Sequence, residues 1–449
     1  MARKGTVHVC SDCGAQSPTW MGMCPHCGAY GTLHPASGSA AQRATPAASA
    51  TPLADVSLED MPRKGSGFSE VDRVLGGGFV PGAVLLLVGE PGIGKSTLTL
   101  QAALHVGDEG GSVLIAAGEE SPKRIHERAR RLSGVSSRVL VTEARDIDAV
   151  LAAASSVGPD LLIVDSIQSV ATTDVDGLPG RPAQIEASTG KLVAFARESG
   201  TSVLMTGHVT KADEFAGPRS LEHEVDQVLY LEGDRWRNLR FLRAVKNRFG
   251  PAFEVGVLTL GRDGLADVPD PSTALLEGRP RGAAGTVVAP CAEGRRILMV
   301  EIQALVGPAK FSTPRLRSRG IPGERAELVA AVLERRVGLP LAATDIFLNV
   351  VGGLDLTEPG VDLPVAAAIA SSLSGRPVPE GTAVIGEIGL AAELRQVSDL
   401  KRREEEARRA GFSRVVFPGG KGPELLGDAL ARLGLAARST AAGTVAGAP

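Results

Sequence analysis

The feature that most restricts how this chain can fold is a glycine-rich octapeptide at positions 89–96, Gly-Glu-Pro-Gly-Ile-Gly-Lys-Ser. The apolar run Val84–Val88 precedes it and predicts a buried strand, and Ser96–Val106 has helical spacing. Between a strand and a helix, such glycines let backbone N–H groups surround phosphate oxygens at the helix N-terminus. The segment therefore predicts a P-loop that binds a nucleoside triphosphate.

The roles of the polar side chains follow from this geometry. Lys95 is expected to reach the β and γ phosphates, and the hydroxyl of Ser96 to ligate Mg²⁺. The apolar run 161–164 predicts a strand that ends in the carboxylate of Asp165, the acid expected on the Mg²⁺ side. The residues predicted to contact ATP and Mg²⁺ are Gly89, Glu90, Pro91, Gly92, Ile93, Gly94, Lys95, Ser96, Thr97 and Asp165.

Hydrolysis also needs a group that orients the attacking water. Glu119 and Glu120 follow the predicted strand Val113–Ala117 and would lie beside the γ-phosphate. Either one is a candidate base, and the sequence does not decide between them. The structural alternative is a solvated charge pair that precedes a helix capped by Ser121.

The wider pattern predicts an α/β protein with several parts. From about residue 57 to 260, short apolar runs alternate with helical patterns, which is typical of a parallel sheet covered by helices. Small residues and prolines at 35–54 predict a flexible linker. The predicted parts are a cysteine cluster (1–30), a linker (31–56), a nucleotide-binding domain (57–270), a second α/β domain (284–437) and a tail (438–449).

Composition narrows the class of protein further. The 51 acidic and 48 basic residues give a net charge of −3, so no overall positive field points to nucleic acid, although a local basic groove stays open. No apolar run nears the ~18 residues that a membrane helix needs, and the N-terminus lacks the apolar core of a signal peptide. The sequence therefore predicts a cytoplasmic protein without a membrane segment.

Four of the five cysteines form two knuckles, Cys10-x2-Cys13 and Cys24-x2-Cys27. Each knuckle brings two thiolates to one ion, and four thiolates in a tetrahedron suit a structural Zn²⁺ with no open position. A redox-active pair and an iron centre of the rubredoxin type are the alternatives. About thirty residues cannot bury a core alone, so metal binding is expected to drive the folding of this segment.

Taken together, these motifs resemble the bacterial RadA (Sms) family of DNA repair proteins. The resemblance covers essentially the whole chain in the same order, and includes the lead-in Gly76-Gly77-Gly78 and the run Lys246-Asn247-Arg248-Phe249-Gly250, which is that family's signature. It implies a RecA-like ATPase core, a hexameric ring, a RecA-type recombinase as partner, and branch migration of recombination intermediates on single-stranded and branched DNA.

The signature also has a physical reading of its own. Lys246 and Arg248 are two residues apart, so they point the same way from an extended backbone. Two cations at a subunit edge can reach a neighbour's γ-phosphate, as arginine fingers do, or grip DNA phosphates, and a solvated hairpin tip is the structural alternative. The predicted catalytic residues are Lys95, Glu119, Glu120, Lys246 and Arg248.

The stretch 207–219 follows a predicted strand and has no regular periodicity. In RecA-like rings such loops line the central channel, so the resemblance implies that Lys211 and Arg219 contact DNA and that His208 senses the γ-phosphate. A loop without fixed structure is the alternative. The full set expected to bind DNA is Lys211, Arg219, Lys246, Asn247, Arg248, Phe249 and Gly250.

From about residue 284 the chain resembles the proteolytic domain of the Lon family. Residues 358–366 are similar to its nucleophile segment and 386–390 to its downstream strand, but Val365 stands at the position of the nucleophilic serine and Arg403 at that of the catalytic lysine. Valine cannot attack a carbonyl, and arginine does not give up its proton. Ser371 and Ser372 lie about two turns further along the same helix. The resemblance implies a scaffold and DNA-binding surface without peptidase activity.

The sequence thus favours a DNA-stimulated ATPase that processes recombination intermediates. An ATP-dependent Lon-like protease is the alternative enzyme, which the missing dyad disfavours. A regulatory RecA-like ATPase that acts by binding proteins is the third reading, and the cysteine knuckles and the signature at 246–250 argue against it.

Overall fold

The computed structural model describes residues 8–13, 15–35, 52, 62–132, 134–208, 220–233, 238–311, 313–419 and 424–435. The chain divides into two compact units, Met1–Asp60 and Met61–Pro449. Within the described residues, no helix combines the length and the apolar character needed to cross a membrane. The finer division into five segments stays a prediction.

The first unit contains a small antiparallel sheet in the order β2-β1-β3. Its strands are β1 (His8–Cys10), β2 (Gln16–Ser17) and β3 (Leu33–Pro35). The buried side chains are few: Cys10, Cys24 and Leu33 form the cluster, with Ala15 packed against it. Two of these three are cysteines, so very little apolar area stabilises the unit, as expected of a segment that relies on a metal.

The second unit is built on a nine-stranded sheet in the order β12-β11-β10-β9-β4-β8-β7-β5-β6. The strands from β9 to β6 are parallel to their neighbours, and β9 to β12 continue the sheet in antiparallel pairs. The strands are β4 (Val84–Gly89), β5 (Val113–Ala117), β6 (Val139–Thr142), β7 (Leu161–Asp165), β8 (Ser202–His208), β9 (Gln227–Gly233), β10 (Leu239–Asn247), β11 (Val255–Gly261) and β12 (Gly264–Asp267).

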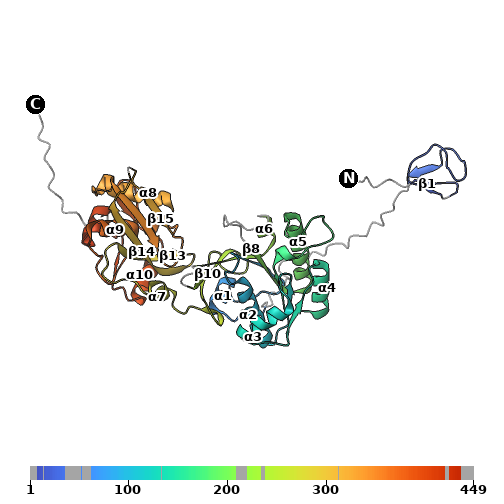
Figure 1. Ribbon diagram of the computed structural model, residues 1–449, viewed down its shortest axis with the longest axis horizontal. Helices are drawn as coiled ribbons and strands as arrows, with labels where there is room; N and C mark the ends of the chain where they lie inside the picture. Colours follow the sequence, from blue (N-terminus) through green and yellow to red (C-terminus); the bar gives the residue numbers. More distant parts are fainter. Residues whose placement is uncertain are drawn as a thin grey trace, which may run out of the picture. The chain divides into compact units, whose positions relative to one another are not determined.

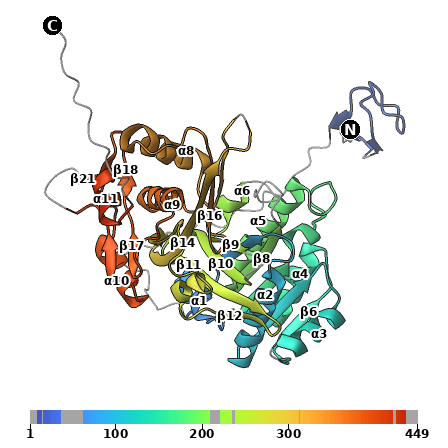
Figure 2. The ribbon, with the colours of Figure 1, turned by 60° about the vertical axis from the view of Figure 1, so that its left-hand side comes forward.

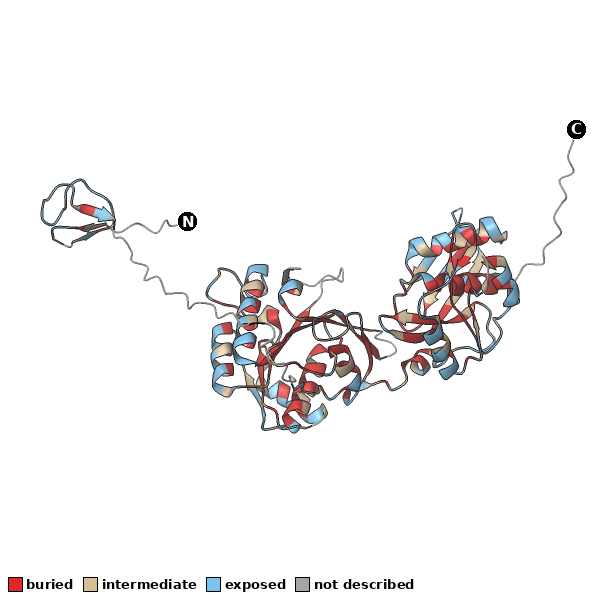
Figure 3. Cartoon of the chain, turned by 180° about the vertical axis from the view of Figure 1, so that it is seen from behind, coloured by how far each residue is buried: buried red, intermediate tan, exposed pale blue. Residues whose placement is uncertain are grey.

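Helices cover both faces of this sheet, because the side chains of each central strand alternate between two cores (Figure 1). Leu85 and Leu87 of β4 face one core, and Val84 and Leu86 face the other. In Figure 3 the strands are red, whereas the helices are red on one side and pale blue on the other. The first face carries α1 (Ser69–Leu75), α2 (Lys95–Asp108) and α3 (Pro122–Leu132), and the second α4 (Ile147–Val157), α5 (Pro182–Ser199) and α6 (Ser220–Glu224).

This arrangement confirms the predicted α/β fold, with the glycine-rich segment between β4 and α2. The expected strands Val113–Ala117 and Leu161–Val164 are present, the latter extended to Asp165. A short 3-10 turn, Ile167–Ser169, follows β7. The parallel strands end on the same edge of the sheet, and that edge carries the residues discussed below.

The rest of the second unit is a further α/β assembly with a six-stranded sheet, β15-β16-β14-β13-β17-β20, and a three-stranded sheet, β18-β19-β21. Helix α9 packs on β13 and β14 (Figure 2). The strands are β13 (Thr286–Glu293), β14 (Arg296–Pro308), β15 (Leu316–Arg319), β16 (Thr344–Val350), β17 (Thr382–Val384), β18 (Glu387–Ile388), β19 (Glu393–Arg395), β20 (Arg414–Val416) and β21 (Glu424–Leu425). The helices are α7 (Pro271–Leu276), α8 (Gly323–Val332), a π-helical turn at Leu333–Val337, a 3-10 turn at Pro359–Val361, α9 (Asp362–Ser374), α10 (Leu400–Arg409) and α11 (Leu426–Arg432).

Two sequence expectations differ from the structure here. The strand expected over 383–388 is two short strands, β17 and β18, that belong to different sheets. The strand is interrupted around Gly386, where a Cβ atom would lie 3.0 Å from Pro418. The boundary expected at 267–283 contains α7, whose N-terminal Thr273 N–H donates to the carboxylate of Asp270 at 3.1 Å.

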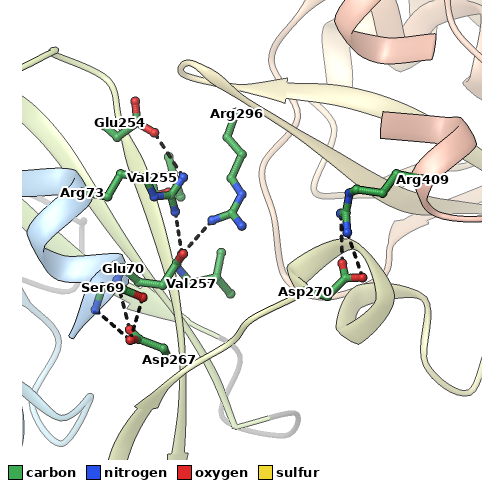
Figure 4. Close-up of polar contacts among 10 residues, drawn as sticks. All are labelled: Ser69, Glu70, Arg73, Glu254, Val255, Val257, Asp267, Asp270, Arg296 and Arg409. Atoms are coloured by element: carbon green, nitrogen blue, oxygen red, sulfur yellow. Dashed lines mark hydrogen bonds and ion pairs between the residues drawn. The ribbon is translucent and has the colours of Figure 1, made fainter. Parts of the chain in front are cut away.

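An ion-pair cluster joins the β13–β14 hairpin to the nucleotide-binding part of the second unit (Figure 4). Glu70 on α1 accepts from Arg73 at 2.6 Å, from Arg296 of β14 at 2.7 Å and from the Val257 N–H at 2.7 Å. Asp267 accepts from the backbone N–H of Ser69 at 2.7 Å and so caps the N-terminus of α1. Helix α1 is thereby held at its first turn from three directions.

Candidate nucleotide and metal sites

The glycine-rich segment connects β4 to α2, which is the context that the sequence predicted. Gly92 and Gly94 have φ angles of +77° and +122°, which glycine adopts far more readily than other residues. A Cβ on Gly89 would meet the carbonyl oxygen of Leu231 at 2.4 Å. These glycines let the backbone turn tightly so that α2 begins at Lys95, with Ser96 and Thr97 in its first turn.

Lys95, His208 and Glu119 form a chain of polar contacts across the ends of β4, β8 and β5. The Lys95 ammonium donates to the carbonyls of Gly89 at 2.7 Å and Glu90 at 3.1 Å, and lies 3.2 Å from His208 Nδ1. An ammonium can only donate, so Nδ1 accepts and Nε2–H faces the Glu119 carboxylate, 3.3 Å away. A positive and a negative side chain are thus linked through one imidazole.

The environment sets the charge of both ends of this chain. Burial lowers the pKa of Lys95, and the charges of Asp165 and Glu119 oppose that effect. The hydrogen bond from His208 lowers the pKa of Glu119 to about 2, and a bond from the Ser166 hydroxyl, at 2.5 Å, acts in the same direction. Glu119 is therefore an ionised carboxylate at neutral pH.

Asp165 lies at the end of β7, next to β8 in the sheet. Its Oδ1 accepts from the Thr206 hydroxyl at 2.6 Å, which fixes the carboxylate at the strand tip. Carboxylate and hydroxyl oxygens are the ligands that Mg²⁺ prefers, and the N-terminus of α2 with Lys95 suits phosphate. The residues present therefore fit ATP, and they offer Asp165 and Ser96 to a magnesium ion.

Glu119 and Glu120 differ sharply in their surroundings. Glu119 faces His208 and Ser166, whereas Glu120 forms an ion pair with Arg128 of α3. The geometry thus separates two adjacent residues that the sequence left equivalent.

The signature segment 246–250 comprises the last two residues of β10 and the turn that follows this strand. The Lys246 ammonium donates to three backbone carbonyls of its own chain, and Arg248, half exposed, lies 3.1 Å from the Asp226 carboxylate. Asn247 donates to the Val74 carbonyl at 3.0 Å and accepts from Gln227 at 2.8 Å, while Phe249 packs against the core.

Gly250 lies so close to the end of α1 that a Cβ there would approach Gly76 at 3.0 Å. The glycines at 76–78 and the signature thus meet in space although some 170 residues separate them. Asn247, Phe249 and Gly250 are engaged inside their own subunit, and Arg248 is the exposed side chain of the motif. Lys211 and Arg219 lie outside the described residues.

Three residues that the sequence analysis did not single out position the site. Ser166 and Thr206 hold the two carboxylates, and Arg240, buried on β10, donates through Nε to the P-loop carbonyl of Ile93 at 2.8 Å. Small hydroxyl side chains at strand ends are common, so neither hydroxyl gave a signal. For Arg240, the signal in the sequence was a charged residue within the apolar strand pattern of 239–245.

In the first unit, the four cysteine sulfurs lie within 4.8 Å of one another. The Sγ distances are 3.7 Å from Cys10 to Cys27 and 3.7 Å from Cys13 to Cys24. Four thiolates at ~2.3 Å from one ion in a tetrahedron are about 3.8 Å apart, so the cluster fits a four-coordinate metal. The predicted metal-binding cysteine cluster is confirmed.

Val365 and Arg403, which the sequence analysis placed at the positions of the Lon dyad, are both buried. Val365 is fully buried in α9, and Arg403 of α10 forms an ion pair with Glu358 at 2.6 Å. The hydroxyl of Ser371 donates to a backbone carbonyl and accepts from the Gly285 N–H, and that of Ser372 accepts from the Val306 N–H. The candidate nucleophiles are thus occupied by structural hydrogen bonds.

Comparisons with known proteins identify families that match both sites. Residues 52–214 match the family described as "AAA domain", and residues 8–35 match the family described as "Rubredoxin metal binding domain". The chain is 41% identical over 427 residues to the DNA repair protein RadA of Bacillus subtilis, with 93% of each chain covered.

Two further relatives carry the same name. The DNA repair protein RadA of Pseudomonas aeruginosa is 41% identical and covers 94% of this chain and 95% of its own, and that of Mycobacterium tuberculosis (strain H37Rv) is 42% identical and covers 93% and 89%. These matches each cover more than nine-tenths of the chain. The chain belongs to the RadA family of DNA repair proteins.

Proposed function

We propose that this protein is a DNA-stimulated ATPase that drives branch migration of recombination intermediates during DNA repair. The observation that carries the proposal is the set of Lys95, Glu119 and Asp165 on one edge of a P-loop sheet, in a member of the RadA family. Single-stranded and branched DNA are its substrates and a RecA-type recombinase is its partner. The protein acts in the cytoplasm as a homo-oligomeric ring, which we propose is a hexamer.

Each residue of the nucleotide site has a distinct proposed role. The P-loop and Lys95 bind the phosphates, and Ser96 and Asp165 hold Mg²⁺, which neutralises phosphate charge when it is bound. Glu119 accepts a proton from the attacking water, and His208 connects this carboxylate to Lys95. A neighbouring subunit supplies Arg248, whose surface ion pair with Asp226 is weak enough to exchange for a phosphate.

The metal of the first unit is Zn²⁺ in a structural role, since four thiolates leave no open coordination position. Metal analysis should find one zinc per chain, and Cys24→Ser should release it and unfold residues 8–35 while ATP binding persists. Iron in place of zinc would instead support a rubredoxin-type centre, and no metal at all would overturn the assignment.

The test of the proposed function is ATP hydrolysis with and without single-stranded DNA. We expect DNA to increase turnover several-fold, and a branched substrate to be converted in an ATP-dependent manner. Turnover that is unaffected by either DNA would instead favour a regulatory ATPase. The same preparation should show no ATP-dependent peptidase activity, because Val365 and Arg403 provide neither nucleophile nor base.

A further inference from the structure

Strand β10 lies between two packed cores, and its side chains alternate between them. Leu242 and Ala244 pack in the core that includes side chains of the P-loop and α2, whereas Leu239 and Phe241 pack in the core that includes β13 and β14. Arg240 lies on the same face of the strand as Leu242, because residues two apart point the same way. It is 4% exposed, so a charged side chain is buried on the face of β10 that packs with the P-loop.

The guanidinium of Arg240 binds the P-loop backbone. Its Nε donates to the carbonyl oxygen of Ile93 at 2.8 Å, and Nη1 donates to the carbonyl of Leu239 at 2.8 Å. The aliphatic part of the side chain passes over Gly233, where a Cβ would lie 2.8 Å from Arg240 Cδ. A hydrogen bond from a charged donor is stronger than one from a neutral donor. The Ile93 carbonyl is therefore held firmly by a residue that lies 147 positions later in the chain.

The peptide unit that Arg240 binds joins Ile93 to Gly94. Gly92 and Gly94 have φ angles of +77° and +122°, and glycine changes backbone conformation at little steric cost. In a trans peptide, the carbonyl of one residue and the N–H of the next point in opposite directions. Because the Ile93 carbonyl points to Arg240, the Gly94 N–H points away from it. A reversed unit would present an oxygen where a phosphate needs a donor.

Other contacts place the loop and its helix against the antiparallel strands without setting the direction of this peptide unit. A Cβ on Gly94 would lie 3.6 Å from the Leu265 side chain of β12. Gln101 of α2 donates to the Leu265 carbonyl at 3.1 Å and accepts from the Leu265 N–H at 2.8 Å. These contacts fix where α2 lies, whereas the bond from Arg240 fixes which way a P-loop carbonyl points.

Arg243, three residues further along β10, provides an internal comparison. Its side chain lies on the opposite face of the strand, where it pairs with Glu232 of β9 at 2.9 Å and with the buried Glu293 of β13. Among the described residues, no hydrogen bond joins Arg243 to the P-loop. The two arginines of β10 thus have different partners, the P-loop for Arg240 and β13 for Arg243.

We propose that Arg240 is a positioning residue for nucleotide binding, which holds the Ile93–Gly94 peptide unit with its N–H available to a phosphate group. Arg240 acts through the P-loop backbone and not by contact with the nucleotide. The proposal rests on the binding of ATP by the P-loop, which is part of the proposed function, and it is independent of DNA and of the ring.

Binding of MgADP to the full-length protein, measured by titration calorimetry, tests the proposal without hydrolysis or DNA. Arg240→Met keeps a long unbranched side chain and removes its donors. We expect the dissociation constant to rise about tenfold or more, the change expected when a hydrogen bond from a charged group is lost. Arg240→Lys retains a donor and should recover part of this loss. Equal affinities of the Met and Lys variants would show that the side chain only fills space.

Arg243→Met is the matched control, because it removes the other arginine of β10 and leaves the bond to Ile93 in place. We expect it to change the affinity for MgADP by no more than about twofold, although it breaks a buried ion pair. An equal loss of affinity in both variants would overturn the proposal, because the cause would then be a general loosening of β10. Wild-type affinity in Arg240→Met would overturn this proposal alone, whereas a wild type that fails to bind MgADP would overturn the proposed nucleotide site as well.

Amide hydrogen exchange without nucleotide gives a second readout. The N–H groups of Thr97 and Leu98 donate to the Gly94 carbonyl at 3.1 Å and 2.9 Å, so they report on the start of α2. In Arg240→Met, exchange in residues 93–98 should become about tenfold faster, while exchange in β7 stays unchanged and shows that the fold is kept. Arg240→Lys should give a smaller increase, and it is the variant to measure if Arg240→Met folds poorly. Unchanged exchange in 93–98 for the Arg240 variants would overturn the proposal.

Discussion

The nucleotide site and the Arg403–Glu358 pair each contain a cationic side chain from a helix and a carboxylate. The two sites differ in how much hydrogen-bonding capacity remains for a ligand. Arg403 is 1% exposed, and its guanidinium binds Glu358 at 2.6 Å and 3.0 Å and the carbonyls of Pro290 and Ser398. Every bond of that pair is made within the fold. Lys95 is almost as buried, but its partners are loop carbonyls and an imidazole, which a phosphate can replace.

The comparison shows that the same residue types are open to solvent in one place and enclosed in the other. Glu119 is half exposed beside Lys95 and His208, so it can meet water and substrate. Glu358 accepts from two guanidinium N–H groups of Arg403 and from the Ala292 N–H, so most of its acceptor positions are used within the fold. A paired charge indicates a functional site only when its partners are exchangeable.

The sharpest test of the comparison is Lys95→Ala. No other side chain of the loop carries a positive charge, so we expect ATP turnover to fall below detection while the protein remains folded. Lys123→Ala, which removes an exposed lysine of α3, is the control and should leave turnover unchanged. Normal hydrolysis by a folded Lys95→Ala protein would contradict the nucleotide site.

Glu119→Gln and Glu120→Gln should separate the two adjacent carboxylates. We expect about 10²- to 10⁴-fold slower turnover for Glu119→Gln, because a general base contributes in that range. Glu120→Gln loses an ion pair with Arg128 and should change turnover by no more than about twofold. Steady-state ATP hydrolysis at saturating ATP measures both, and the reverse order would assign the base to Glu120.

Breaking the Arg403–Glu358 pair should lower the stability of the surrounding structure. Arg403→Met leaves the Glu358 carboxylate without its cation, which is expected to destabilise the surrounding structure by about 3–5 kcal/mol. Hydrogen exchange of the α10 amides in the full-length protein gives this free energy locally. Adding Glu358→Leu should restore much of the loss, and a double variant as unstable as the single one would argue against the pair as its cause.

The smallest expected effect concerns pH. The His208 hydrogen bond is the main cause of the low pKa of Glu119, about 2, so His208→Gln should raise it toward the ordinary value. Glu119 must be ionised to accept a proton, so a higher pKa moves the acid limb of the turnover profile to higher pH. Turnover of both proteins is measured from pH 4 to pH 8. The wild type should show no acid limb from Glu119 in this range, because that pKa is about 2, whereas His208→Gln should lose turnover toward pH 4. Identical profiles would show that Glu119 does not set the acid limb.

Much of the site could be predicted from the sequence because its signals are local. The P-loop, the Asp165 strand end and the two cysteine knuckles each lie within a few residues, and backbone geometry at that range leaves few alternatives. The chemistry of Val365 and Arg403 can be judged from the sequence for the same reason, since valine has no nucleophilic group and arginine does not give up its proton. Local motifs of this kind fix which groups are available.

Tertiary structure decided the surroundings of each of these groups, because those depend on partners far away in the chain. Glu119 and Glu120 are adjacent, yet Glu119 contacts His208, 89 residues later, whereas Glu120 forms an ion pair with Arg128. Lys246 and Arg248 look equivalent in an extended strand, but the carbonyls of α6 surround only the first. Side chains of the same type come to differ because residues far away in the chain bury them or form hydrogen bonds with them. A local sequence pattern does not contain that information.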